Sequence, residues 1–200
     1  MKKVRFLLLV LIMGISGVAD AQLRYGISLG GVFAANNLEN VQDYSLGNRS
    51  GFTGGLLLEY QFSKCGFAPD VAVMYSRQNS RLRLNGEKPM SFGRNYLMIP
   101  INLKYKFPIN YFNDLFSPMI YTGYELGIRA GGGDERCPLD TRSIQSGLNL
   151  GVGFDIVNFI QLTGGYTFAI GNEVKKFQGF PNAKMKANHW NIAVRLLFDF

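Results

Sequence analysis

The chain ends in the stretch HWNIAVRLLFDF, residues 189–200, in which large apolar side chains alternate with smaller or charged ones. Alternation with a period of two is typical of a β-strand whose two faces meet different environments. One face would carry every second residue from Trp190 to Phe200, and the other would carry Arg195 and Asp199. Chain ends usually fray into water, so a terminus this apolar predicts a final strand that is held out of water.

The same alternation recurs in seven earlier segments of about ten residues, separated by polar stretches that contain glycine. These segments lie at 23–34, 51–62, 67–76, 96–107, 119–129, 144–156 and 159–169. Long connections, at 35–50, 79–95, 130–143 and 170–187, alternate with connections that are mostly short. The sequence therefore predicts an all-β chain that forms an eight-stranded antiparallel up-and-down transmembrane β-barrel, with short turns at one end and long loops at the other.

A soluble barrel that carries a ligand also alternates, with its apolar face turned inward. Here one face carries nearly all the large residues, and the other carries Gly, Ala, Ser and charged residues. Eight strands enclose only enough room for side chains to fill. Aromatic residues gather toward the strand ends, as they do at both interfaces of membrane strands. These features favour a membrane barrel with the small and charged face inside.

The inward face carries charges of both signs, and buried charges persist when they are paired. Arg24, Lys104, Lys106 and Asp199 all fall on this face. We expect a structural network of ion pairs that fills the lumen and leaves no wide pore. The members that we single out are Glu59, Asp70, Glu125, Arg129, Asp155 and Arg195.

Residues 1–21 have the pattern of a secretory signal peptide. Basic residues precede an apolar run over 6–13, and Ala19 and Ala21 occupy the positions of an A-x-A cleavage site. Cleavage after Ala21 would leave residues 22–200, about 180 residues and one domain. The formal charge would fall from +7 to about +5, because three basic residues and Asp20 are lost. This excess is too small to indicate a nucleic-acid partner.

Three stretches resemble one known family. NYLMIPINLKYKF (95–107), FAPDVAVMYSRQNS (67–80) and GLNLGVGFDI (147–156) resemble the PorT-like outer-membrane β-barrel family of Bacteroidetes. Asp70 stands where that family more often has glutamate, which keeps the charge. The resemblance implies an eight-stranded barrel in the outer membrane of a Gram-negative cell. It implies little about activity, although the type member is linked to protein secretion.

Nothing in the sequence predicts catalysis, a metal site or a cofactor. The single histidine, His189, has no serine at strand spacing that could serve as a nucleophile. One His and two distant Cys residues make no zinc ligand set. Cys65 falls in a short turn and Cys137 in a long loop, so we expect no disulfide between them.

The long loops are rich in basic residues, which suit phosphate groups. We therefore predict contacts to lipopolysaccharide from Arg81, Arg83, Lys175 and Lys176, against the alternative of a solvated loop surface. The expected function is structural or one of surface interaction through these loops. The alternatives are an accessory subunit of a secretion or transport machine and a small-solute channel.

A final strand that ends in an aromatic residue resembles the signal that the outer-membrane assembly machinery recognises. We predict that Trp190, Phe198 and Phe200 form this signal. The expected partners are therefore outer-membrane lipid and this assembly machinery.

Overall fold

The structure, a computed structural model, contains thirteen strands and no helix in the residues that it describes. The described residues are 21–35, 37–39, 44–48, 50–62, 65–84, 90–108, 115–132, 139–171, 174–177 and 184–199. Eight of the strands are long: β1 (Ala21–Ala34), β4 (Ser50–Phe62), β5 (Phe67–Leu84), β6 (Met90–Lys106), β7 (Phe116–Gly132), β9 (Ile144–Ile156), β10 (Ile160–Ala169) and β13 (His189–Asp199). Within this part of the chain no helix is long and apolar enough to cross a membrane.

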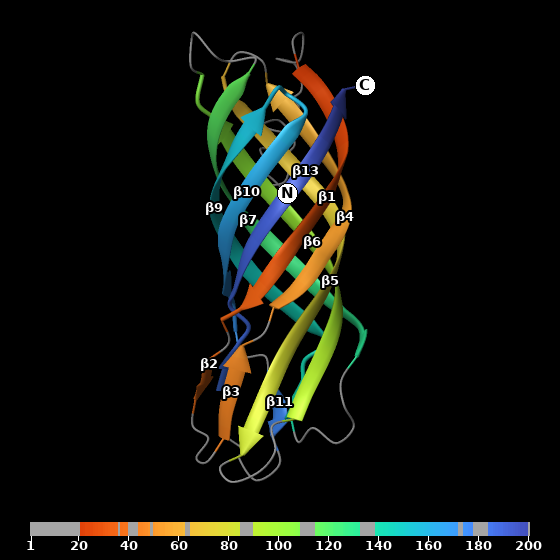
Figure 1. Ribbon diagram of the computed structural model, residues 1–200, viewed down its shortest axis with the longest axis vertical. Coiled ribbons are helices and arrows are strands. Elements are labelled where there is room, and N and C mark those ends of the chain that lie inside the picture. The colour runs from red at the N-terminus through yellow and green to blue at the C-terminus, as the bar shows by residue number, and fades with distance from the viewer. Residues whose placement is uncertain are drawn as a thin grey trace, which may run out of the picture.

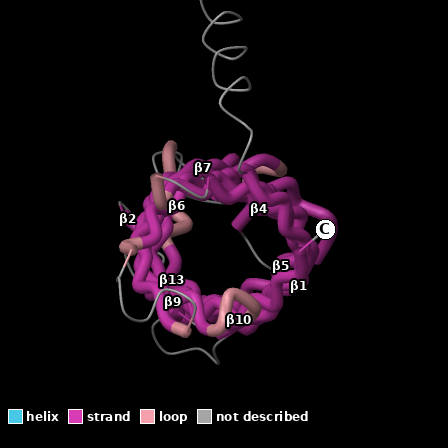
Figure 2. The backbone as a smooth tube through the Cα atoms, turned by 90° about the horizontal axis from the view of Figure 1, so that it is seen from above, coloured by secondary structure: helices cyan, strands magenta, loops and turns pink. Residues whose placement is uncertain are grey.

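The eight long strands close into a barrel in the order β1-β4-β5-β6-β7-β9-β10-β13. Every neighbouring pair is antiparallel, and β1 pairs with both β4 and β13, which joins the first strand to the last. Figure 2 shows the resulting ring of strands from above. Closure matters because an unpaired backbone group in lipid costs several kcal/mol, so a spanning sheet needs to have no edges. The predicted eight-stranded antiparallel up-and-down barrel is confirmed.

The alternation in the sequence becomes an outer and an inner wall. Leu56 of β4 is 68% exposed, whereas the next residue, Leu57, is 3% exposed. On β13, Trp190, Ile192, Val194 and Phe198 are likewise exposed on the outer wall. This outer row is the surface that lipid would cover.

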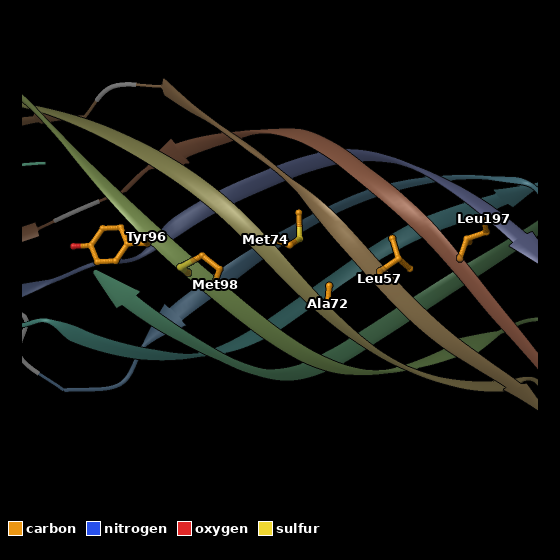
Figure 3. Packing of buried hydrophobic residues seen from close by; sticks show 6 residues of the cluster. All are labelled: Leu57, Ala72, Met74, Tyr96, Met98 and Leu197. Atoms are coloured by element: carbon orange, nitrogen blue, oxygen red, sulfur yellow. The ribbon is translucent and has the colours of Figure 1, made fainter. Parts of the chain in front are cut away.

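The inner wall is less uniformly small and charged than the sequence suggested. Inward-pointing apolar side chains form one cluster, shown in Figure 3, that consists of Leu57, Ala72, Met74, Tyr96, Met98 and Leu197. Gly26 lies opposite Leu57 on one side and Leu197 on the other. A Cβ at Gly26 would collide with the backbone oxygen of Leu196, so glycine lets the two strands approach closely here.

The two ends of the barrel differ in their connections. Short turns join β4 to β5 and β9 to β10 at the short-connection end. At the opposite, long-connection end, β5 and β6 continue to Leu84 and from Met90, so the long loop expected at 79–95 is in fact mostly strand. A further strand, β3 (Tyr44–Asn48), pairs with this part of β5. The alternating pattern did not predict this extension, because strands beyond the lipid have water near both faces.

Parts of the other long connections also pair. β2 (Asn37–Glu39) pairs with β12 (Lys184–Lys186), and β8 (Leu139–Thr141) pairs with β11 (Val174–Phe177). In Figure 1, β2, β3 and β11 lie at the lower end, away from the C-terminus. The expectation that these connections are loops without strands is therefore wrong for these residues.

The predicted signal peptide lies outside the described residues except for Ala21, which begins β1 opposite Phe62. Gln22, the first residue after the expected cleavage, is the next residue of the strand and lies opposite Gln61.

Candidate functional site

Glu59 is the centre of an ionic network near the short-connection end of the lumen. Its carboxylate contacts Nη1 of Arg24 at 3.1 Å, Nζ of Lys104 at 2.5 Å and Nζ of Lys106 at 2.7 Å. The four residues come from β1, β4 and β6, where strand alternation turns each side chain inward. Glu59 and Lys104 are fully buried, so these charges are stabilised by one another and not by water.

Asp155 extends the network to β9. Its Oδ2 lies 3.2 Å from Arg24 Nη1 and 2.7 Å from Lys106 Nζ. The amide of Gln161 on β10 joins the two carboxylates, because its Nε2 donates to Glu59 and to Asp155, each at 3.0 Å. The Oε1 of Gln161 accepts a hydrogen bond from Lys104 at 2.9 Å. Gln161, on β10, is therefore a buried bridge between charges on three other strands, β4, β6 and β9.

Asp70 forms the next layer. It lies 2.6 Å from Lys104 Nζ and 2.9 Å from Arg195 Nη1, and it accepts a hydrogen bond from Asn102 at 2.8 Å. Asn149 in turn donates to Asn102 at 3.2 Å. The network thus passes from ion pairs to amide hydrogen bonds toward the middle of the barrel.

The network balances its charges. Asp199 lies 3.2 Å from Arg24 Nε, and Arg24 also donates through Nη2 to the backbone oxygen of Asn158. The described acidic members are Glu59, Asp70, Asp155 and Asp199, and the basic members are Arg24, Lys104, Lys106 and Arg195. Equal numbers of each sign allow every buried charge to have a partner, which a buried ion pair requires.

The structure brings together four of the six residues singled out from the sequence, namely Glu59, Asp70, Asp155 and Arg195. Glu125 lies apart from them. Its Oε1 is 3.3 Å from Nε2 of His189, and Nδ1 of His189 lies 3.3 Å from the oxygen of Ala187. Arg129 is half-buried farther along β7, beside a register shift at the long-connection end.

Gln161 is a member of the network that the pattern of charged residues did not predict. The sequence does carry a signal for it, because Gln161, Thr163 and Thr167 share the face of β10 that lies opposite its apolar row. The structure buries all three side chains. A search for charges alone passes over a neutral amide, although an amide both donates and accepts hydrogen bonds and so can join unlike partners.

A small chamber lies above the network, toward the long-connection end. Its volume is about 50 Å³. Arg195 and Asn102 line it beside the network, and Glu125 and His189 line it as well.

The aromatic residues of the predicted assembly signal lie on the outer wall. The rings of Trp190 and Tyr166 meet edge to face with centroids 4.7 Å apart. Phe198 contacts Phe159 in the same way at 5.1 Å and lies 5.7 Å from Tyr25. Phe200 lies outside the described residues.

The predicted lipopolysaccharide contacts belong to strands of the long-connection end, and their side chains lie outside the described part. Arg81 and Arg83 are in β5, opposite Gly47 and Ser45 of β3. Lys175 and Lys176 are in β11.

No cluster of three potential metal ligands occurs among the described residues. Cys65 is exposed and free, and Cys137 lies outside the described residues.

A closed wall with an apolar outside and a lumen that paired charges occupy at one end defines a class, the small integral β-barrels of the outer membrane. The chain belongs to the family described as outer membrane protein beta-barrel domain, whose model matches residues 6–198. A comparison with curated proteins finds no match.

Two solved structures illustrate the similarity. The outer membrane protein OprG of Pseudomonas aeruginosa has a TM-score of 0.63 at 12% identity, over 90% of this chain and 96% of that one. Neisserial surface protein A (NspA) has a TM-score of 0.51 at 17% identity, over 87% of this chain and 97% of that one. Sequence identities this low show that the fold is shared and nothing more.

Proposed function

We propose that this outer-membrane barrel is non-enzymatic and acts as a structural or surface-interaction protein through its extracellular, long-connection end. The observation that carries the proposal is the ionic network around Glu59, which fills the lumen at the short-connection end. The buried partners of Glu59 come from strands on several sides of the barrel. A lumen filled in this way favours a rigid scaffold over a conduit.

The geometry around His189 supports a non-enzymatic role. Its ring contacts a carboxylate through Nε2 and a backbone oxygen through Nδ1. Each ring nitrogen thus already faces an oxygen atom of the protein. A general base needs a nitrogen lone pair directed at the proton that it removes.

Planar-bilayer recordings test the closed lumen. We expect the purified, folded protein to give no steady conductance, while an open porin measured in the same bilayers gives stable steps. Steady, reproducible conductance from the unaltered protein would favour the alternative of a small-solute channel.

The extracellular end supports a role in surface contact. A membrane-spanning strand needs about 9–11 residues, whereas β5 has 18 residues and β6 and β7 have 17 each. The surplus corresponds to roughly 20–30 Å along the strand at about 3.3 Å per residue. Strands of this length can carry the outer connections past the lipid headgroups and into the carbohydrate of the outer leaflet.

Lipopolysaccharide is the proposed contact of this end, through Arg81, Arg83, Lys175 and Lys176. Changing all four to Glu should weaken binding of purified lipopolysaccharide several-fold and reduce its dependence on salt, because phosphate contacts are screened by ions. Lys64→Glu, in the connection between β4 and β5, is the control and should leave binding unchanged. Equal binding by the fourfold variant would contradict the proposal.

Two finer assignments accompany this role. We propose membership of the PorT-like subgroup, supported by the motifs at 67–80, 95–107 and 147–156. A secretion accessory, the second candidate, would retain stoichiometric partners when purified from detergent-solubilised membranes.

We also propose cleavage after Ala21, and amino-terminal sequencing of the membrane-extracted protein should then begin at Gln22.

A further inference from the structure

His189 lies where the last strand leaves the wall of the barrel and continues as a two-stranded ribbon. It is the outermost residue of β13 in the pairing with both neighbours, opposite Ala34 of β1 and Thr167 of β10. Beyond this level β12 and β2 keep the register of β13 and β1, whereas the described pairing with β10 stops. The seam ribbon, as we call β2 and β12 together, therefore departs from the wall at residues 187–189.

Asn188 joins this point of departure to two other parts of the wall. Its backbone oxygen accepts a hydrogen bond from the amide of Ala35, just after β1, at 2.8 Å. Its side-chain Oδ1 accepts one from the amide of Ala169, at the end of β10, also at 2.8 Å. Residues 187–189 thus form a junction that orders the base of the seam ribbon.

The ring of His189 adds two contacts to the junction whose strength depends on protons. Nε2 lies 3.3 Å from Oε1 of Glu125 on β7, and Nδ1 lies 3.3 Å from the backbone oxygen of Ala187. A neutral imidazole carries one N–H, whereas an imidazolium carries two. Only the protonated ring can donate to both oxygens at once, and only the protonated ring forms an ion pair with the carboxylate.

The surroundings leave His189 as the group that changes charge near neutral pH. The chamber beside it has four lining residues that can carry a charge, namely Tyr121, Glu125, His189 and Arg195. Arg195 already pairs with Asp70 at 2.9 Å, and the residues opposite His189 on β1 and β10 are uncharged. Arg129, also on β7, does not line the chamber. Among these side chains, histidine is the one that ordinarily changes charge between about pH 5 and 8.

We propose that protonation of His189 locks the junction and that its deprotonation frees the seam ribbon. At acidic pH the imidazolium holds both Glu125 and the oxygen of Ala187, so the chain is fixed on both sides of Asn188. At alkaline pH the neutral ring donates to one of these oxygens, and the other contact is lost. The ribbon at the extracellular mouth thereby becomes more mobile as the pH rises. This inference concerns the motion of the ribbon and does not depend on what the extracellular end binds.

The single histidine of the chain allows a direct test by nuclear magnetic resonance. The full mature chain, labelled with heavy nitrogen at histidine and folded in detergent micelles, gives a separate signal for each ring nitrogen. We expect both nitrogens to carry protons at about pH 5 and one of them to lose its proton by about pH 8. A ring that stays neutral, or stays doubly protonated, across this range would overturn the proposal.

Hydrogen exchange measures the motion itself. The amide of Ala35 donates to the oxygen of Asn188, so its protection reports on the junction. We expect this protection, corrected for the intrinsic effect of pH on exchange, to fall several-fold from about pH 5 to about pH 8. The amide of Leu197 donates to the oxygen of Phe159 at the short-connection end and should keep its protection. Equal protection of Ala35 at both pH values would overturn the proposal.

Substitutions assign the effect to the ring and its partner. His189→Asn keeps a side chain that donates and accepts hydrogen bonds but does not titrate, so the protection of Ala35 should become independent of pH. Glu125→Gln removes the carboxylate and should reduce the pH dependence. Asp199→Asn changes a carboxylate that pairs with Arg24 at the opposite end and should leave it unchanged. Full pH dependence in either of the first two variants would overturn the proposal.

Discussion

At the scale of single residues, Glu59 is a fully buried carboxylate that holds three cations of the lumen together. It receives ion pairs from Arg24, Lys104 and Lys106 and a hydrogen bond from Gln161. Removing one partner of a buried ion pair is more damaging than removing both, because the remaining charge stays buried without compensation. The consequence should be measurable in the stability of the whole barrel.

Glu59→Gln should lower the free energy of unfolding by about 3–5 kcal/mol, since it leaves the network with an excess positive charge. The measurement is urea unfolding of the protein in lipid vesicles. Glu125→Gln is the matched control and should cost less, because Glu125 is partly exposed and pairs with His189 outside this network. Adding Lys104→Met to Glu59→Gln should recover part of the loss, and a loss that is not recovered would argue against charge imbalance as its cause.

The residues of this network also show the limit of the sequence. Alternation assigned Glu59, Asp155 and Arg195 to the inner face, and the structure places them there. Alternation could not state which charges meet, because residues that are close across a lumen are far apart in sequence. Glu125 illustrates this, since its position on the inner face was readable and its partner, His189, was not.

At the scale of elements, the turn between β9 and β10 carries backbone strain. Val157 and Asn158 have φ values of +56° and +53°. Phe159 N–H donates to the oxygen of Ile156 at 3.2 Å, which closes a two-residue hairpin. This turn type favours Asn-Gly, whereas a β-branched residue such as Val157 rarely adopts a positive φ.

Replacing Val157 with Asn and Asn158 with Gly should therefore raise the free energy of unfolding by about 1 kcal/mol, because the strain is relieved. Urea unfolding provides the measurement. Gly171, with φ of +95° just after β10, is the control of opposite sign, because a Cβ there would meet nothing within 4 Å. Gly171→Ala should be destabilising, and a stabilising effect there would show that positive φ does not determine the stability of these turns.

Glycines in β9 and β10 make room for one aromatic side chain inside the barrel. The ring of Tyr121 lies where a Cβ at Gly151 or Gly165 would be. The glycine-rich segment therefore has a packing reason, which is the close approach of a tyrosine from β7.

Gly151→Val should displace Tyr121 and cost about 1–3 kcal/mol through overpacking. Gly164→Ala, one residue before Gly165 in the same pair of strands, is the control, because nothing lies within 4 Å of a Cβ there. Thermal unfolding of the two variants should differ clearly. Equal stability would contradict the packing role of Gly151.

At the scale of the whole molecule, closure depends on the seam between the first and last strands. β1 and β13 pair continuously from Arg24 opposite Asp199 to Ala34 opposite His189. Phe198 packs beside Tyr25 at the short-connection end of this seam. The last residues of the chain are thus both the closing strand and the proposed assembly signal.

Deleting Phe200 should lower the amount of protein in the outer-membrane fraction several-fold, because the assembly machinery would recognise its substrate less well. Immunoblots of fractionated membranes provide the measurement. Phe200→Tyr keeps an aromatic terminus and is expected to insert normally. Normal outer-membrane levels of the truncated chain would contradict the assembly role.

The sequence by itself determined the number of membrane strands and the inward position of the charged residues, since both follow from a two-residue period that lipid imposes on every spanning strand. The stretch 189–200 shows this most clearly, and β13 begins at His189 as its pattern indicated. The tertiary structure alone decided the partners in the lumen, the bridging role of Gln161 and the extension of β5 and β6 beyond the lipid. Contacts across a closed barrel join residues that no local pattern relates, and outside the membrane there is no lipid to impose a pattern.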